Sequence, residues 1–411
     1  MTLYKISQRL LGALERGTRS SGGQPFAGIV FDCDGVLIDA KDSYDLALEV
    51  SASAFASLLG LKFSTDQLRN ALEALRRLGT FNNDWDSLAV IVAYLFARSS
   101  SRETILSLST LTPISSRLRY FESKVLEAMG KEEDSSITSE SLSIPLSSEL
   151  YPSSTTSSSN RIIDLAELAT VVEESQLGSR RDALISKLIP DAMLLDQFYR
   201  SISYPAPVGE SLLATFFDEA MYGTNVFRST YGFECATSTF SKPGLINNEK
   251  LIIKPMTLES LSQLCSNNLG IITGRPRVPT IHTLGSLFGK YFTNPSLCLF
   301  TGDYLLNSEE VKPSPKPMLR VASALVNGQP QSLQSPILYV GDSGEDMLMV
   351  KRANEIAGTA EMSVLFAAIA EDRQKAEFFR SQGDAVDCIV SNVNELSRAL
   401  LSNQIRNSAQ Q

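Results

Sequence analysis

Carboxylates, lysines and hydroxyls must carry any chemistry in this chain, because it contains one histidine among 411 residues. That count excludes metal sites built from several histidines and makes any Ser-His-Asp or Cys-His mechanism depend on His282. His282 lies in a segment with helical periodicity, where a packing or surface role is more common than a catalytic one. The five cysteines include no C-x-x-C pair, so neither a zinc site nor a disulfide framework is indicated.

Two aspartates, Asp32 and Asp34, stand one residue apart at the end of the apolar run of residues 28–31. Gly35 follows them, and a residue without a side chain lets the backbone turn away tightly. This arrangement places two acids in one small pocket. A D-x-D pair by itself is common in surface turns, so its position after an apolar run is what makes it a candidate site.

Two further segments offer groups that suit phosphate. Thr273 and Gly274 end a second apolar run, and a hydroxyl beside main-chain N–H groups at a strand-to-helix turn can hold phosphoryl oxygens. An ordinary turn cap is the alternative. Lys312 precedes two prolines, which fix the local backbone as a positioned ammonium would require. Taken singly, such a lysine is more often a surface charge in a loop.

Asp342 and Asp346 follow another apolar run, residues 337–340, at the expected start of a helix. Residues four apart in a helix face the same side, so one carboxylate can serve as a hard oxygen ligand for a cation while the other supports it. Capping of the helix N-terminus by Asp342 or Ser343 is the alternative.

These polar segments are predicted to meet because each follows a strand of one parallel sheet. The apolar runs are residues 28–31, 269–272, 297–300 and 337–340. Helical patterns separate the later runs, at residues 258–265, 278–288 and 317–325. Strands and helices that alternate at this spacing predict parallel β-α-β units, whose ligands bind at the carboxyl ends of the strands. We therefore expect an α/β fold with a Rossmann-like parallel sheet core and helices on both faces.

A second domain is predicted to be inserted into this core. The core is assigned to residues 26–42 and 240–403, and it closes with one more strand and a helix over residues 387–401. Residues 43–239 carry mainly helical patterns, so we expect them to form a helical cap with a flexible serine-rich insertion at about 98–160.

The two ends of the chain are expected to lie outside this core. Apolar residues at helical spacing predict an amphipathic helix at residues 3–14, within a lead-in segment of residues 1–25. Docking against the core is the favoured role for this basic helix, and an organelle-targeting presequence is the alternative. Residues 404–411 are polar and predict a frayed tail.

The overall composition favours a small-molecule partner. A net charge of -9 and a pI near 5.0 give the surface no general attraction for nucleic acid or anionic lipid. The sequence contains no apolar run of membrane-spanning length and no secretory signal, and its scattered cysteines fit a reducing cytoplasm. We expect a cytoplasmic protein that binds neither nucleic acid nor membrane. Nothing in the sequence indicates an oligomeric state.

Taken together, the four polar segments resemble the motifs of the haloacid dehalogenase-like (HAD) hydrolase superfamily. They are FDCDGVLID at residues 31–39, IITG at 271–274, KPSP at 312–315 and GDSGED at 341–346. The resemblance covers the core, and the insertion after the first motif matches the position of the family's helical cap. Segments 78–86, 244–250 and 273–277 look like a branch of subfamily IA near the phosphoglycolate phosphatase group.

This resemblance implies a Mg²⁺-dependent phosphatase. Asp32 would attack phosphorus to form an aspartyl-phosphate, and Asp34 would protonate the leaving oxygen and later deprotonate water. Asp32, Asp34 through its main-chain carbonyl, and Asp342 would hold the metal ion, with Asp346 beside them. Phosphoryl oxygens would be bound by Thr273, Gly274 and Lys312.

The substrate implied by the resemblance is a small phosphate ester, nominally phosphoglycolate, with histidinol phosphate and sugar phosphates as alternatives. Candidate substrate contacts are Arg275, Asn83 and Trp85, although a helix cap and a buried tryptophan explain the last two equally well. A carbon–halogen bond needs no acid for its leaving group, so Asp34 argues against dehalogenation. A phosphomutase and a non-catalytic phosphate-binding or regulatory module stay open as alternatives.

Overall fold

The computed structural model describes residues 3–19, 24–78, 81, 83–130, 161–175, 179–304, 309–328, 335–357 and 363–408. The chain divides into two compact units. The core unit comprises Met1–Asp42 and Ile246–Gln411, and the helical unit comprises Ser43–Leu245. This division lies close to the insertion expected at residues 43–239.

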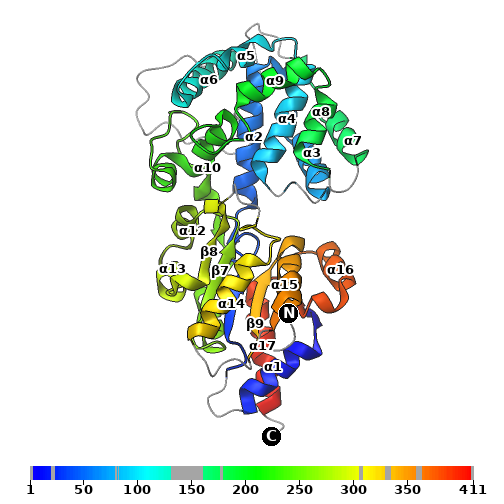
Figure 1. Cartoon of the computed structure of the whole chain (residues 1–411), viewed down its shortest axis with the longest axis vertical. Helices are drawn as coiled ribbons and strands as arrows, with labels where there is room; N and C mark the ends of the chain where they lie inside the picture. Colours follow the sequence, from blue (N-terminus) through cyan, green and yellow to red (C-terminus); the bar gives the residue numbers. More distant parts are fainter. Residues whose placement is uncertain are drawn as a thin grey trace. The chain divides into compact units, whose positions relative to one another are not determined.

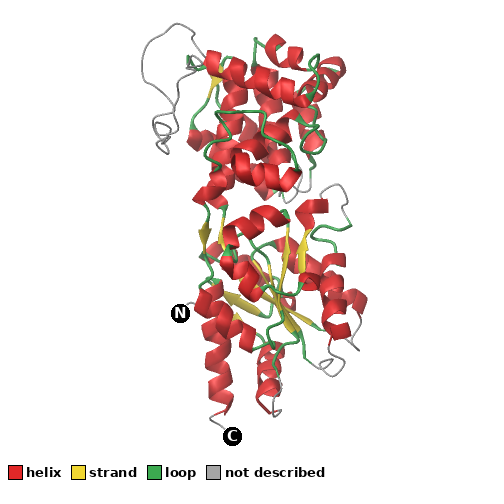
Figure 2. Ribbon diagram, turned by 90° about the vertical axis from the view of Figure 1, so that its left-hand side faces the viewer, coloured by secondary structure: helices red, strands yellow, loops and turns green. Residues whose placement is uncertain are grey.

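A seven-stranded sheet lies at the centre of the core unit (Figures 1 and 2). The strand order is β1-β11-β10-β9-β2-β7-β8, and every neighbouring pair is parallel except β1 and β11. The strands are β1 (Leu3–Ile6), β2 (Gly28–Phe31), β7 (Leu269–Thr273), β8 (Cys298–Phe300), β9 (Ile337–Gly341), β10 (Val364–Ile369) and β11 (Cys388–Val390). Helices flank the sheet, which is why β2, β7, β9 and β10 are buried along their whole length and are mostly apolar. The predicted α/β class is confirmed.

The helices of the core unit follow the predicted alternation, with two differences. They are α1 (Gln8–Arg19), α11 (Pro255–Gln263), α12 (Arg277–Leu284), α13 (Ser286–Tyr291), α14 (Lys316–Gly328), α15 (Gly344–Ala357), α16 (Arg373–Ser381) and α17 (Val393–Ser408). The single helix expected at 278–288 is interrupted at Gly285, whose φ of 54° ends α12. Helix α17 continues to Ser408, so the tail expected from residue 404 begins as helix.

The amphipathic helix predicted at residues 3–14 is confirmed from Gln8 onward as α1, but the expectation that the chain begins with it outside the core is wrong. Residues Leu3–Ile6 form β1, which pairs antiparallel with β11 and adds an edge strand to the sheet. Ser7 then starts α1, because its hydroxyl accepts a hydrogen bond from the N–H of Leu10 at 3.1 Å and donates one to Asp387 at 2.7 Å. Helix α1 packs against α17. The first residues are therefore part of the core unit.

Strand β10 is a second element that the sequence analysis does not anticipate. It lies between β9 and β11 and pairs in parallel with both. Its sequence, VLFAAI, contains two alanines, which have a low preference for strands. Burial between its two neighbours and their flanking helices outweighs that local preference.

Helices make up most of the helical unit (Figure 2). They are α2 (Lys41–Leu58), α3 (Thr65–Arg77), α4 (Asp84–Arg98), α5 (Glu103–Leu108), α6 (Ile114–Ala128), α7 (Ala166–Glu173), α8 (Arg181–Leu188), α9 (Ala192–Ile202) and α10 (Leu212–Tyr231), with a short parallel pair of β4 (Leu61–Lys62) and β5 (Arg161–Ile162). Helix α4 is buried from Ser87 to Phe96, so it forms the centre of this unit. An aromatic cluster from α2, α6 and α10 packs nearby, with ring centroids 4.8 to 6.3 Å apart among Phe55, Phe121 and Phe216.

The flexible insertion expected at about 98–160 is wrong in its first part. Residues 98–130 contain α5 and α6, and α6 buries Leu118, Phe121 and Val125 in the unit's interior. Serine and threonine side chains in this region bond back to main-chain carbonyls one turn earlier, as Ser109 does to Leu106, so they remain compatible with helix ends. Residues 131–160 lie outside the described residues.

The chain passes between the two units twice, and one strand pair of the core unit lies next to both connections. Strand β3 (Ile38–Asp39) precedes the exit at residue 42, and β6 (Lys250–Leu251) follows the return at residue 246. The two strands pair antiparallel, with Ile38 opposite Leu251 and Asp39 opposite Lys250. The two connections are thereby held side by side.

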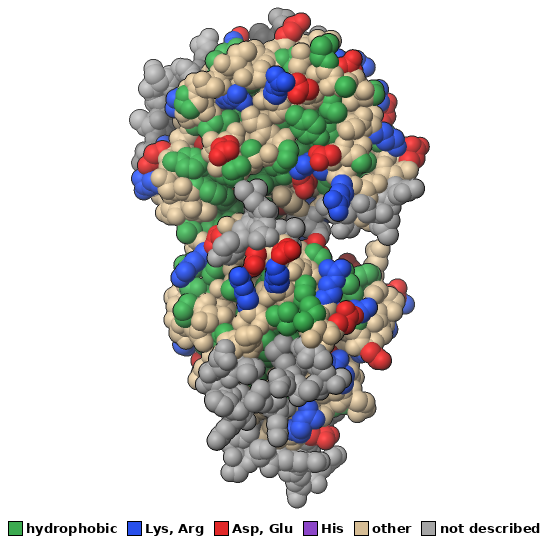
Figure 3. All heavy atoms as spheres, viewed as in Figure 1, with side chains coloured by type: hydrophobic (Ala, Val, Ile, Leu, Met, Phe, Trp, Pro, Cys, Tyr) green, Lys and Arg blue, Asp and Glu red, His purple; other side chains and the backbone are tan. Residues whose placement is uncertain are grey.

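Among the described helices, none combines the length and the apolar character needed to cross a lipid bilayer. On the face drawn in Figure 3, acidic and basic side chains are interspersed.

Candidate active site

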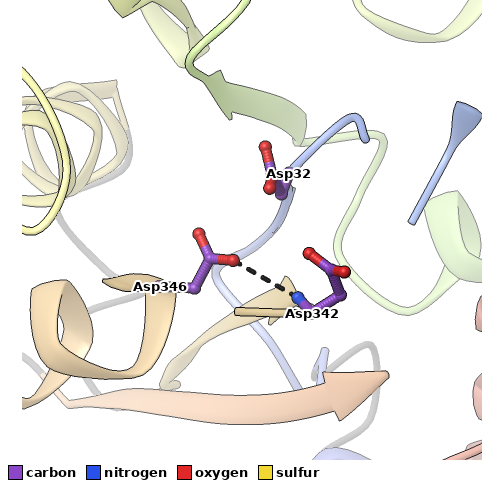
Figure 4. Close-up of side chains that lie close together, drawn as sticks. All are labelled: Asp32, Asp342 and Asp346. Carbon is purple, nitrogen blue, oxygen red and sulfur yellow. Dashed lines mark hydrogen bonds between the residues drawn. The ribbon is translucent and has the colours of Figure 1, made fainter. Parts of the chain in front are cut away.

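Three aspartates gather at the carboxyl ends of β2 and β9, two adjacent strands in the middle of the sheet (Figure 4). Asp32 directly follows β2, Asp342 directly follows β9, and Asp346 lies in the first turn of α15. One carboxylate oxygen from each lies within 4.8 Å of the other two. The sequence-based expectation that these acids meet at one edge of the sheet is therefore met by Asp32, Asp342 and Asp346.

Lys312 lies among these carboxylates, as predicted. Its Nζ atom is 2.8 Å from Oδ1 of Asp32 and 2.8 Å from Oδ1 of Asp346, and its side chain is 9% exposed. Burial opposes the charged form of this lysine, but Asp32 and Asp346 outweigh burial and hold its pKa above the ordinary value. The ammonium group is thus fixed between two carboxylates rather than free in solvent.

Asp346 is the most firmly held of the three acids. Its Oδ1 accepts hydrogen bonds from Tyr339 at 2.8 Å and from Lys312, and its Oδ2 accepts from the hydroxyl of Ser343 at 2.7 Å and from two main-chain N–H groups. Burial alone would raise its pKa, but Lys312 and these hydrogen bonds outweigh burial and hold the pKa of Asp346 below its usual range. Asp346 is therefore a charged anchor for the surrounding groups.

Asp32 and Asp342 lie in surroundings that disfavour a negative charge. Burial raises the pKa of Asp32 well above its ordinary value, Lys312 opposes this, and the other nearby acids add to it. Burial also raises the pKa of Asp342, against the opposing effect of Lys375, whose Nζ lies 2.7 Å from Oδ2. A cation next to these two carboxylates would favour their charged forms and reduce the repulsion between them.

The donor set fits a hard divalent cation. All three clustered groups are carboxylates, and Lys312 and Lys375 place ammonium groups against them. When all three carboxylates are ionised, the two ammonium groups leave one negative charge unbalanced, which a bound cation would offset. Oxygen ligands of this kind suit Mg²⁺ or Ca²⁺ better than a softer metal.

Two glycines let the backbone approach these acids closely. Gly35 has a φ of 71°, and a Cβ atom at this position would collide with the carboxylate of Asp342. A Cβ atom on Gly341 would lie 2.6 Å from Cβ of Asp346. Glycine at 35, expected from the sequence as a tight turn, therefore also makes room for a carboxylate from the neighbouring strand.

The side chain of Asp34 lies outside this cluster of three. It is 41% exposed, and its Oδ1 accepts a hydrogen bond from Nη1 of Arg275 at 2.8 Å. A contribution of Asp34 to a metal site would therefore come from its main-chain carbonyl, as the family resemblance implies. The exposed carboxylate is available for proton transfer instead.

Arg275 is not placed as the sequence analysis expects. Its side chain is 1% exposed and forms two hydrogen bonds with the carboxylate of Glu249, at 2.8 and 2.9 Å, besides the one to Asp34. A guanidinium enclosed by two protein carboxylates is not a surface group that meets a substrate. The prediction that Arg275 contacts the substrate is corrected: Arg275 contacts Asp34 and Glu249 instead.

Thr273 and Gly274 lie at the same edge of the sheet as Asp32, because β7 is the other neighbour of β2. Thr273 ends β7, is fully buried, and accepts a hydrogen bond from the N–H of Arg275 at 3.2 Å through its hydroxyl oxygen. Gly274 is exposed, with no heavy atom of the described residues within 4 Å of where a Cβ would stand. Open main chain beside Thr273 is the kind of surface that a phosphoryl group requires.

Asn83 and Trp85 have partners within the helical unit. The side chain of Asn83 caps α4 by accepting a hydrogen bond from the N–H of Trp85 at 2.9 Å, and Nε1 of Trp85 donates to Asp218 at 3.0 Å. The contact of Asn83 corresponds to the helix cap raised as its alternative, whereas Trp85 is half-buried. His282, the single histidine, is exposed on α12.

Sequence reasoning misses Tyr339, Lys375 and Glu249. Tyr339 lies inside β9, where an aromatic residue reads as core, and its hydroxyl reaches Asp346. Lys375 lies in a segment without a motif, and Glu249 lies in segment 244–250, whose resemblance does not single it out. No local pattern signals the pairing of Lys375 with Asp342 or of Glu249 with Arg275, because these contacts are created by the fold.

Comparisons with known proteins give information on the fold of this chain and none on its activity. No family model matches the chain, and no curated protein matches it. The chain is similar to an X-ray structure of a Northeast Structural Genomics Consortium target, with a TM-score of 0.54 and 15% sequence identity over 92% of this chain and 99% of that one. A likeness at this identity speaks for a shared fold alone.

Proposed function

We propose that this protein is a Mg²⁺-dependent phosphatase that hydrolyses a small phosphate monoester through an aspartyl-phosphate at Asp32. The observation that carries the proposal is the cluster of Asp32, Asp342 and Asp346 at the carboxyl ends of central parallel strands, with Lys312 held between Asp32 and Asp346. Ligand sites of open parallel sheets lie at this edge. The four motif resemblances described above name the same residues.

Asp32 is the nucleophile in this proposal. Its Oδ1 accepts hydrogen bonds from Lys312 and from the N–H of Cys33 at 2.7 Å, so we assign the attack to Oδ2. A bond forms between Oδ2 and phosphorus while the bond from phosphorus to the leaving oxygen breaks, and its electron pair stays on that oxygen. Holding the nucleophile at one end keeps its other oxygen at a fixed distance from phosphorus.

Asp34 moves the protons. Protonated Asp34 gives its proton to the leaving oxygen in the first step, so the alcohol departs neutral. In the second step Asp34 accepts a proton from the water that attacks phosphorus. The bond between phosphorus and Oδ2 then breaks, which releases inorganic phosphate and restores Asp32.

Asp32, Asp342 and the main-chain carbonyl of Asp34 would hold the magnesium ion, and Asp346 would support them. When bound, the ion offsets the repulsion between these carboxylates and a phosphate dianion. Thr273, Gly274 and Lys312 would bind the phosphoryl oxygens through a hydroxyl, main-chain N–H groups and an ammonium. We also propose a cytoplasmic location, supported by Cys33, Cys235, Cys265, Cys298 and Cys388 being free thiols.

The test is phosphate release by the purified protein over a panel of phosphate monoesters, with Mg²⁺ or with a chelator. We expect turnover that requires Mg²⁺ and that falls by more than about 1,000-fold in Asp32→Asn, since an amide cannot form the intermediate. Asp384→Asn, at an exposed aspartate away from the cluster, serves as the matched control. Phosphate release that is unchanged by the chelator or by Asp32→Asn would contradict the proposal.

A further inference from the structure

Arg275, Glu249 and Asp34 form a group of ion pairs next to the candidate active site. Arg275 is 1% exposed, the side chain of Glu249 is fully buried, and that of Asp34 is 41% exposed. Both terminal nitrogens of the guanidinium face Glu249, and Nη1 also reaches Asp34 at 2.8 Å. One charged side chain therefore connects a buried carboxylate to an exposed one.

Stability alone is a poor reason for this arrangement. A buried ion pair loses about as much hydration as it gains in attraction, so an apolar pair of similar size is often equally stable. Glu249 already balances the charge of Arg275, and Thr283 donates a further hydrogen bond to Glu249. The charge of Arg275 is therefore neutralised without Asp34, and the hydrogen bond from Nη1 to Asp34 calls for another explanation.

The geometry favours a fixed orientation for Asp34. A guanidinium bound at two nitrogens by one carboxylate cannot rotate, so its remaining N–H groups point in set directions. The main-chain N–H of Arg275 also donates to Thr273, which ties the arginine to the end of β7. Arg275 binds Asp34 at Oδ1, and the side chain of Asp34 is 41% exposed.

Main-chain contacts close a ring around these side chains. Asp34 forms a bridge with Ile38, the first residue of β3, and β3 pairs with β6, which begins directly after Glu249. Asp34 is therefore held to Glu249 twice, through Arg275 and through the strand pair. Both connections between the units start from that strand pair.

We propose that Arg275, clamped by Glu249, is a positioning residue that holds Asp34 in the orientation required for proton transfer to the leaving oxygen. This inference rests on the proposed phosphatase function and assigns a task within it. Loss of the clamp would let the exposed carboxylate rotate away while Asp32, Lys312 and the acidic cluster stay in place.

The dependence on the leaving group provides the test. p-Nitrophenolate departs without a proton, whereas an alkoxide requires one, so a misplaced Asp34 slows the first step, formation of the aspartyl-phosphate, selectively for alkyl esters. Relative to wild type, we expect Arg275→Met combined with Glu249→Met to lower kcat/KM for the fastest alkyl ester by about 10- to 100-fold, and kcat/KM for p-nitrophenyl phosphate by about threefold or less, because kcat/KM does not include hydrolysis of the intermediate. Asp34→Asn should show the same selectivity in kcat/KM, while its kcat falls for both esters because hydrolysis of the intermediate lacks its base.

The double variant removes both buried charges together, so neither is left unpaired, and circular dichroism checks that it folds. Arg275→Lys keeps one donor and should recover part of the activity toward the alkyl ester. Arg277→Ala, at the exposed arginine of the same turn, should keep the wild-type ratio between the two esters.

Equal losses on both esters, or no loss on either, in folded variants of an active protein would overturn the role of Arg275 and leave the phosphatase proposal standing. A wild-type protein that hydrolyses neither ester would contradict the phosphatase proposal, and this inference with it.

Discussion

Lys312 is buried between two carboxylates that would repel each other without it. Its Nζ lies 2.8 Å from both Asp32 and Asp346, whereas Lys375 is 26% exposed and pairs with Asp342. An ammonium in the interior interacts more strongly with its partners than one near solvent, because the surrounding dielectric is lower. The two lysines are therefore expected to differ in their importance.

Replacement of Lys312 by methionine is expected to lower kcat for phosphate esters by about 100-fold or more, because the developing charge on the phosphoryl group loses its fixed cation. Lys375→Met, which removes a more exposed ammonium, should cost less. Steady-state kinetics on both purified variants measure the difference, with circular dichroism to verify folding. A larger loss in Lys375→Met than in Lys312→Met would contradict this ranking.

Asp218 is a buried carboxylate in the helical unit. It is 2% exposed and accepts hydrogen bonds from Trp85 at 3.0 Å and from the hydroxyl of Tyr231. Burial raises the pKa of Asp218 to about 7, against the opposing effect of these two hydrogen bonds. The folded protein therefore binds a proton at this site over a pH range in which the unfolded chain has released it.

This raised pKa predicts a loss of stability as pH rises. The contribution of Asp218 is complete below its unfolded pKa near 4 and disappears as pH passes about 7, so between pH 5 and pH 8 it falls by roughly 2–3 kcal/mol. Urea unfolding at both pH values, compared with Asp218→Asn, isolates this term. Because Trp85 is the only tryptophan, its fluorescence should titrate over the same range. An identical pH dependence in the variant would disprove the assignment.

At the scale of elements, side-chain caps define where several helices begin. Ser64 forms a capping box with Gln67 at α3, and Asn83, Asp191 and Ser211 cap α4, α9 and α10. Each cap satisfies main-chain N–H groups that the first helical turn leaves without a carbonyl partner. Asn83 thus has a structural task at the start of α4.

Asn83→Ala is expected to lower the free energy of unfolding by about 1 kcal/mol through loss of this cap. Ser64→Ala, which removes the corresponding cap of α3, is the matched control and should cost a similar amount. If Asn83 serves only as a cap, KM for the best substrate stays unchanged. Chemical denaturation and steady-state kinetics measure the two quantities. A raised KM in Asn83→Ala, absent in Ser64→Ala, would restore the predicted substrate contact.

The elements that the sequence predicts well are those with one dominant signal. Strands β2, β7 and β9 stand out as apolar runs because helices cover both sides of the sheet, and each ends in the polar residues that form the site. Leu3 and Ile6 fit the helical spacing of the residues after them, so β1 is recognised only through its pairing with β11. Asp342 and Asp346 could be paired from their spacing of four. The contact between Arg275 and Glu249 depends on how β6 and α12 meet, which no local pattern encodes.

At the scale of the whole molecule, two units with separate interiors share one chain. The core unit carries the acidic cluster, and the helical unit has its own centre around α4. A ligand that binds only the folded core unit should stabilise that unit by mass action. Metal binding can therefore be followed without knowledge of the substrate.

Magnesium is expected to raise the Tm of the core unit. At a concentration about 100 times its Kd, one bound ion adds about 2.7 kcal/mol to the free energy of unfolding. Asp342→Asn removes a proposed ligand and should abolish most of this shift, whereas Asp384→Asn should retain it. Differential scanning calorimetry with and without Mg²⁺ makes the comparison. An equal shift in Asp342→Asn would place the ion elsewhere.

The central claim is that Asp32 becomes covalently phosphorylated, and trapping that state tests it most directly. Asp34→Asn protein mixed with p-nitrophenyl phosphate and Mg²⁺ should accumulate the intermediate, because the leaving group needs no acid while hydrolysis lacks its base. Acid quenching, borohydride reduction and peptide mass spectrometry then identify the modified residue. We predict modification at Asp32, and none when Asp32→Asn is added to the same protein. A phosphoryl group on another residue, or phosphate release with no modified residue, would contradict the account.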